Sequence, residues 1–178
     1  YFCNKHNTQH TSGKQDNIKT TCRTCGKGLM DMQRRKNKDK RKEIKDMETR
    51  VEKTIERHNK GYNCAQAVAC SFCEEFGIDQ ETMFRVSEGF GLGMGMMDMC
   101  GAVTGMLMVI GMENSVGNLD GKKPSKGDTY KKAKAYAQKF KEMEGSYYCR
   151  ELKGVATGTP LVPCSQCIAN AVELTEQY

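Results

Sequence analysis

Four cysteines of this 178-residue chain stand where new helices are expected to begin, namely Cys64, Cys100, Cys149 and Cys164. The first turn of a helix presents unpaired N–H groups and partial positive charge, which favour a thiolate over a thiol. A thiolate is both a nucleophile and a soft-metal ligand, so the four sulfurs could do redox or metal chemistry if the fold gathers them. For each of them, a buried cysteine that only packs is the alternative.

Two further cysteine pairs have C-x-x-C spacing. Cys167 follows Cys164 at a helix start, where it could be a spare ligand or a resolving thiol. Cys70 and Cys73 lie inside an expected helix, away from a helix start, and we interpret them as non-essential.

The amino-terminal part contains a separate candidate site. Cys3-x-x-His6 and Cys22-x-x-Cys25-Gly would supply the four ligands of a tetrahedral zinc knuckle. Because few apolar residues surround this set, a segment without a metal site is the alternative.

The elements that must position these sulfurs are helices. Apolar residues at helical spacing predict helices over residues 48–60, 64–76, 80–88, 100–112, 129–144 and 164–177, with a short turn at 147–152. Asn63 with Gln66, Asp79 and Asp128 are the expected N-caps. No segment has the pattern of a strand, and the glycine-rich residues 89–95 therefore lack the strand that a phosphate-binding loop requires. The sequence predicts an all-α bundle of about five helices with a short extra turn.

Charge divides the chain into two parts. Residues 1–46 hold 13 Lys and Arg against 5 Asp and Glu, whereas residues 47–178 hold 15 against 17. We therefore expect a basic extension over 1–46, most simply a solvated linker, and a main domain over 47–178. Contact with nucleic acid is expected only through that extension, if at all.

Composition also limits compartment and chemistry. No apolar stretch reaches the ~20 residues of a membrane span, and the polar amino end has no apolar signal core, so we expect a cytoplasmic protein. Ten cysteines then favour metal binding or redox chemistry over structural disulfides. His58 is the main domain's only histidine, which argues against classical hydrolysis. We expect it to be a helix-dipole partner or a surface residue rather than a ligand.

The cysteine-bearing segments together resemble a known family. GYNCAQAV (61–68), CGAVTG (100–105), GSYYCREL (145–152) and the proline-led Cys164 are similar to the redox-active four-cysteine family, over roughly residues 48–175. The resemblance assigns the family's four cysteines to Cys64, Cys100, Cys149 and Cys164, and implies a small helical domain for electron or thiol transfer. A similar domain of split-Soret cytochrome is associated with an iron–sulfur-type centre, and only that implication carries over, because C-x-x-C-H is absent here.

Three functions remain open at this stage. The cysteine quartet could hold an iron–sulfur-type centre for electron transfer, cycle between dithiol and disulfide, or hold a structural zinc in an interaction module. We expect a redox partner protein. Whether the protein is an enzyme, and on which substrate it would then act, is left open. A homodimer is possible and is also left open. Gly101 and Gly105 lie one turn apart and are expected to let a neighbouring sulfur-bearing helix approach Cys100 closely.

Overall fold

The computed structural model describes residues 49–117, 119–121 and 124–178. Within these ranges the chain is all-α and has no β-strand. Its elements are α2 (Arg50–Asn59), α3 (Cys64–Cys70), the 3₁₀ turn η1 (Cys73–Phe76), α4 (Gln80–Glu88), the π turn η2 (Gly93–Met97), α5 (Gly101–Asn114), α6 (Lys126–Glu144), α7 (Cys149–Leu152) and α8 (Cys164–Glu176). The described residues contain seven α-helices, against an expected bundle of about five with a short extra turn, because α4 and α7 are helices in their own right. The basic extension over residues 1–46 lies outside the described residues.

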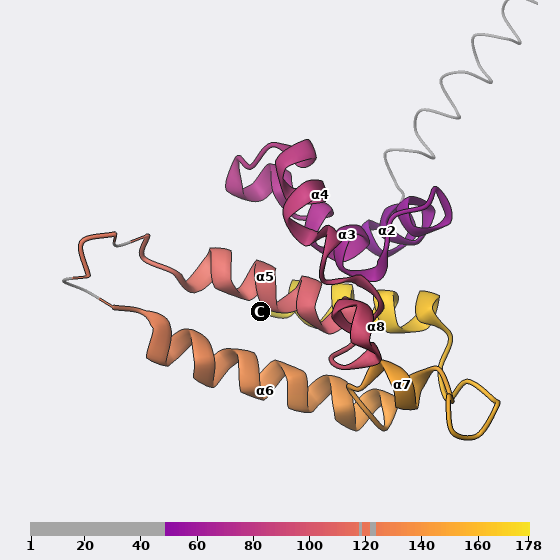
Figure 1. The fold of residues 1–178 in the computed structure, drawn as a ribbon. Coiled ribbons are helices and arrows are strands. Elements are labelled where there is room, and N and C mark those ends of the chain that lie inside the picture. The colour runs from indigo at the N-terminus through magenta and orange to yellow at the C-terminus, as the bar shows by residue number, and fades with distance from the viewer. Residues whose placement is uncertain (1–48, 118, 122–123) are drawn as a thin grey trace, which may run out of the picture. The chain divides into compact units, whose positions relative to one another are not determined.

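Helix α5 is the central element of the bundle. It packs against α3, α6 and α8, and it pairs with α6 as a long antiparallel hairpin (Figure 1). Gly105 of α5 lies so close to α3 that an added Cβ would stand 2.8 Å from the Ala65 carbonyl oxygen and 2.9 Å from Val68 Cβ. These two helices therefore meet backbone to backbone, which requires glycine.

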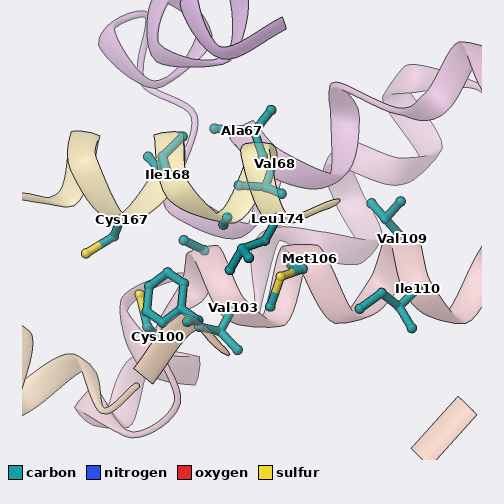
Figure 2. Packing of buried hydrophobic residues seen from close by; sticks show 14 of the residues in the cluster. Ala67, Val68, Cys100, Val103, Met106, Val109, Ile110, Cys167, Ile168 and Leu174 are labelled. Carbon is teal, nitrogen blue, oxygen red and sulfur yellow. The ribbon is translucent and has the colours of Figure 1, made fainter. Parts of the chain in front are cut away.

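The apolar core follows the inner face of α5. Val103, Met106 and Ile110 are fully buried there, together with Phe140 of α6 and Ile168 of α8. Figure 2 shows the side chains of Cys100 and Cys167 at one end of this core, while Val109 and Ile110 lie toward the other end. The core thus holds two cysteine-bearing helices against each other near their amino ends.

Local capping explains where most helices begin. Asn63 and Gln66 form the expected capping box, and Asp79 accepts a hydrogen bond from the Thr82 N–H at 2.8 Å. The expected cap at Asp128 is wrong: α6 begins at Lys126, and Asp128 lies within its first turn. An acidic side chain also stabilises a helix from that position, so the sequence signal was correct in kind but misplaced.

The single helix expected over residues 64–76 is also wrong. Helix α3 ends at Cys70, and the 3₁₀ turn η1 begins at Cys73. Arg50 Nη1 donates to the Ser71 carbonyl oxygen at 3.0 Å, and Arg57 Nη1 donates to Ser71 Oγ at 3.1 Å. These tertiary bonds hold the interruption, for which the local sequence has no glycine or proline.

No helix among the described residues combines the length and apolarity needed to cross a bilayer.

Candidate functional site

Five cysteines line one cavity of about 300 Å³: Cys64, Cys100, Cys149, Cys164 and Cys167. They come from the starts of α3, α5, α7 and α8, which are far apart in sequence. Cys100, Cys149 and Cys167 are buried, whereas Cys64 and Cys164 are partly exposed. We call this cavity the thiol pocket. All five cysteines are free thiols, so they are available for redox or metal chemistry.

The capping box at the start of α3 fixes Cys64. Asn63 Oδ1 accepts from the Gln66 N–H at 2.9 Å, and Gln66 Oε1 accepts from the Asn63 N–H at 2.9 Å. A Cβ added to Gly101 would lie 3.0 Å from Cys64 Cβ, so α5 approaches Cys64 as closely as a glycine permits. The glycine at 101 thereby brings the segments of Cys64 and Cys100 together.

A two-stranded contact holds Cys100 and Cys149. Met99 and Tyr148 form an isolated antiparallel bridge. The Cys100 N–H donates to the Tyr147 carbonyl at 2.8 Å, and the Cys149 N–H donates to the Asp98 carbonyl at 2.6 Å. Backbone hydrogen bonds thus hold together the two segments that carry these cysteines, at the starts of α5 and α7.

The loop that precedes α8 is hydrogen-bonded to the end of α7. The Leu161 N–H donates to the Leu152 carbonyl at 2.8 Å, which brings the loop before Cys164 back to the cysteine of α7. Cys167 lies on the following turn of α8, and a spacing of three residues puts it on the same face as Cys164. This periodicity is the signal by which Cys167 could have been placed in the pocket rather than treated as a spare.

Two basic side chains belong to the same pocket. His58, from the last turn of α2, and Lys153, directly after α7, both line it. His58 was expected to be a dipole partner or a surface residue, and it does lie at a helix end. Its place in the wall of the pocket carried no signal in the sequence, because it depends on how α2 packs against α8.

The thiols act on each other in pairs. A hydrogen bond with Cys64 lowers the pKa of Cys164 to about 6, and the nearby positive charges of Lys153 and His58 also contribute. The same contact, together with burial, raises the pKa of Cys64. At neutral pH this pair therefore holds one proton, and the negative charge resides on Cys164.

Cys100 and Cys167 form the second pair. A hydrogen bond with Cys167 and the N–H groups of Ala102 and Val103 at the start of α5 lower the pKa of Cys100. The same contact raises the pKa of Cys167, with burial as the second cause. The contact thus shifts the pKa values of the two thiols in opposite directions, as in the first pair.

The expectation that every helix start favours a thiolate is therefore wrong for two cysteines. The pKa of Cys64 is raised chiefly through its contact with Cys164, and burial raises the pKa of Cys149. Both residues begin short helices, α3 of 7 residues and α7 of 4 residues, which provide little aligned dipole to oppose the loss of water.

The donor set suits a soft metal centre. Thiolates are the preferred ligands of iron–sulfur clusters and of zinc. Within the described ranges, no three His, Cys, Asp or Glu side chains are grouped so that they could hold a metal ion as they stand. The sulfurs instead line the cavity as two interacting pairs and one further cysteine, so the residues fit such a centre in chemical type.

Cys70 and Cys73 lie outside the thiol pocket. Cys70 Sγ donates to the Gln80 carbonyl at 3.9 Å, and Cys73 Sγ donates to the Ala69 carbonyl at 3.7 Å. Burial raises the pKa of Cys70 to about 12, so it is a neutral thiol at physiological pH. The candidate zinc ligands Cys3, His6, Cys22 and Cys25 lie outside the described residues.

Comparison with known proteins agrees with the arrangement of the thiols. A family model described as "Putative redox-active protein (C_GCAxxG_C_C)" matches residues 62–178. Searches among curated proteins and among solved structures gave no match. The matched region contains all five cysteines of the thiol pocket, and the chain belongs to this redox-active four-cysteine family.

Proposed function

We propose that this protein transfers electrons by means of an iron–sulfur cluster held in the thiol pocket. The observation that carries the proposal is the convergence of five free cysteines from four separate helix starts on one cavity. A thiol that only fills the core needs no cavity beside it, and four or five such thiols at one point are not explained by packing.

The pocket is prepared for anionic ligands. Two of its cysteines, Cys100 and Cys164, have lowered pKa values, and each has a partner thiol in contact. Lys153 places positive charge beside Cys164. A bound iron–sulfur cluster would accept and return single electrons, at a potential that depends on surrounding charge and solvent exposure. The partly exposed cysteines Cys64 and Cys164 mark the side open to a redox partner protein.

Anaerobic reconstitution tests the proposal. The full-length protein is reduced, freed of metal, and treated with ferrous iron and sulfide, after which iron, acid-labile sulfide and visible absorbance are measured. We expect stoichiometric iron and sulfide with a brown chromophore. The Cys100→Ser with Cys164→Ser variant should lose both, because it removes one ligand from each thiol pair.

The matched control is the Cys70→Ser with Cys73→Ser variant. It also removes two buried thiols, but these donate to carbonyl groups outside the pocket. It should keep the iron and the absorbance. Wild-type protein without iron or sulfide after reconstitution, or equal loss in both double variants, would contradict the proposal.

A second function is favoured by the contact between Cys64 and Cys164. A thiolate of pKa about 6 beside a neutral thiol is the arrangement of a nucleophile and its partner in thiol–disulfide exchange. In that reaction Cys164 would attack a substrate disulfide and release one thiolate. Cys64 would then give up its proton, attack the mixed disulfide at the Cys164 sulfur, and release the second thiolate.

The two functions differ in the state of the metal-free protein. Exchange requires that an added disulfide oxidise the apo-protein by two electrons and leave a Cys64–Cys164 bond, which peptide mapping would detect as the loss of two hydrogens. An apo-protein in which these thiols stay reduced against excess disulfide contradicts the second function and leaves the first intact.

A further inference from the structure

His58 is the one nitrogen-bearing ring in the wall of the thiol pocket. The other residues that line it are the five cysteines, Lys153, and small, apolar or amide side chains. His58 is partly buried at the end of α2, five residues before Asn63, the N-cap of α3. His58 and Cys164 both line this cavity. It lies outside residues 62–178, which the family model matches.

A backbone contact fixes the chemical form of this ring. His58 Nδ1 lies 2.8 Å from the Tyr62 carbonyl oxygen. A carbonyl oxygen only accepts hydrogen bonds, so Nδ1 is the donor and carries a proton. In the neutral ring the lone pair then belongs to Nε2, which is the atom left for the pocket.

The turn that presents the carbonyl is itself held in place. The Tyr62 N–H donates to the Arg57 carbonyl at 3.2 Å, and Gln80 Nε2 donates to Tyr62 Oη at 3.0 Å. The Tyr62 ring also packs edge-on against Phe84, with 4.8 Å between the ring centroids. The ring of His58 is therefore oriented by a fixed acceptor rather than by solvent.

This arrangement is the one that metal-binding histidines use. Such residues donate one ring N–H to a carbonyl or carboxylate, which fixes the tautomer and makes the other nitrogen a better ligand. In iron–sulfur proteins, histidine in place of cysteine raises the reduction potential of the cluster. A mixed set of sulfur and nitrogen donors would thus change the potential as well as the affinity.

We propose that His58 supplies Nε2 as a nitrogen ligand to the centre held in the thiol pocket, beside the cysteines. The inference rests on the proposed function for the identity of the centre. It assigns to this histidine a role that a helix-dipole partner does not have, since a dipole partner needs charge near the helix end but no ring nitrogen directed at the pocket.

The variant His58→Asn provides a sharp test. Its side-chain amide nitrogen can donate to the Tyr62 carbonyl as Nδ1 does, while the atom corresponding to Nε2 is removed. The reconstituted, reduced full-length protein is studied by pulsed electron paramagnetic resonance, with and without ¹⁵N-labelled histidine. We expect strong histidine nitrogen coupling in the wild type, and its loss together with a lower reduction potential in His58→Asn.

The matched control replaces the two other histidines of the chain, as His6→Gln with His10→Gln, and should keep the nitrogen coupling. Wild-type protein that binds iron and sulfide without strong histidine nitrogen coupling, or coupling that persists in His58→Asn, overturns the inference and leaves the proposed function standing. The labelled wild type alone shows whether a histidine nitrogen is coupled to the centre. The inference can therefore be tested even if His58→Asn fails to fold.

A parallel titration with Co²⁺ tests the ligand role of His58 separately from the proposed iron–sulfur function. If the wild type takes up no iron and sulfide, the proposed function fails. Cobalt bound with histidine nitrogen coupling that disappears in His58→Asn would then still support the ligand role. Cobalt bound without that coupling, or no cobalt binding, overturns the inference as well.

Discussion

At the scale of single residues, the thiol pocket contains neighbouring cysteines whose pKa values differ. Cys164 and Cys64 share one environment, yet their contact lowers the pKa of the first and raises that of the second. Two adjacent thiolates would repel each other in a partly buried site, so one proton stays between them. Only one member of the pair is therefore reactive in the metal-free protein.

The pH dependence of alkylation should expose this difference. Thiolate is the reactive form, so its fraction at Cys164 rises as pH increases through about 6 and is nearly complete at pH 8. We expect the rate at Cys164 in reduced apo-protein to reach half its maximum near pH 6, rather than near ~8.5 as in a free thiol. Mass spectrometry of iodoacetamide-treated protein measures it residue by residue. Cys70, with a pKa of about 12, is the internal control and should stay unmodified across this range.

Lys153 should set the potential of the bound centre. Reduction adds negative charge, which the ammonium group beside Cys149 and Cys164 stabilises. Lys153 is exposed, and an exposed charge interaction of ~0.2–1 kcal/mol corresponds to roughly 10–40 mV for one electron. We expect Lys153→Met to lower the reduction potential of the reconstituted protein by this amount in a spectroelectrochemical titration.

Lys153→Arg keeps the charge and should keep the potential. An unchanged or higher potential in Lys153→Met would show that solvent screens this charge completely, and the role given to Lys153 would be withdrawn.

At the scale of elements, the site depends on how closely α3 and α5 approach. The contact at Gly105 leaves no room for a side chain, because an added Cβ would meet the Ala65 carbonyl at 2.8 Å and Val68 Cβ at 2.9 Å. Overpacking of a rigid core typically costs ~1–3 kcal/mol. We expect Gly105→Val to lower the free energy of unfolding by at least this amount in a urea titration, and to weaken iron binding because Cys64 and Cys100 move apart.

Gly111 provides the comparison within the same helix. Apart from its chain neighbours and the backbone of its own helix, no atom lies within 4 Å of a Cβ added there. Alanine is preferred to glycine in a helix interior by ~0.5–1 kcal/mol, so Gly111→Ala should stabilise the protein slightly. If the two substitutions had equal effects, close packing at Gly105 could not be the reason for its glycine.

The same scale shows what the sequence could and could not predict. Caps made by neighbouring residues, such as Asn63 with Gln66, were predictable because a local pattern determines them. The break after Cys70 was not, because Arg50 and Arg57 reach it from another helix. The pairing of Cys100 with Cys167 likewise depends on the packing of α5 against α8, and the place of His58 in the pocket depends on the packing of α2 against α8.

At the scale of the whole molecule, the sequence predicted that the four distant cysteines lie together only because the segments that carry them resemble a known family. Their positions at helix starts were read from local patterns, but sequence separations of tens of residues carry no distance information. Three backbone contacts supply it: the glycine contact between α3 and α5, the bridge between Met99 and Tyr148, and the hydrogen bond from Leu161 to Leu152. The pocket is thus a property of the bundle and not of any one motif.

The whole chain carries two predicted metal sites, and they should be independent. The five thiols of the pocket lie in residues 64–167, whereas the zinc ligands predicted from the sequence are Cys3, His6, Cys22 and Cys25. We expect the full-length Cys3→Ser, Cys22→Ser and Cys25→Ser triple variant to lose bound zinc but keep the iron, sulfide and reduction potential of the wild type. Elemental analysis of both metals in one sample measures this. The Cys100→Ser with Cys164→Ser variant should show the reverse, and loss of iron in both variants would mean that the thiol pocket does not hold its centre alone.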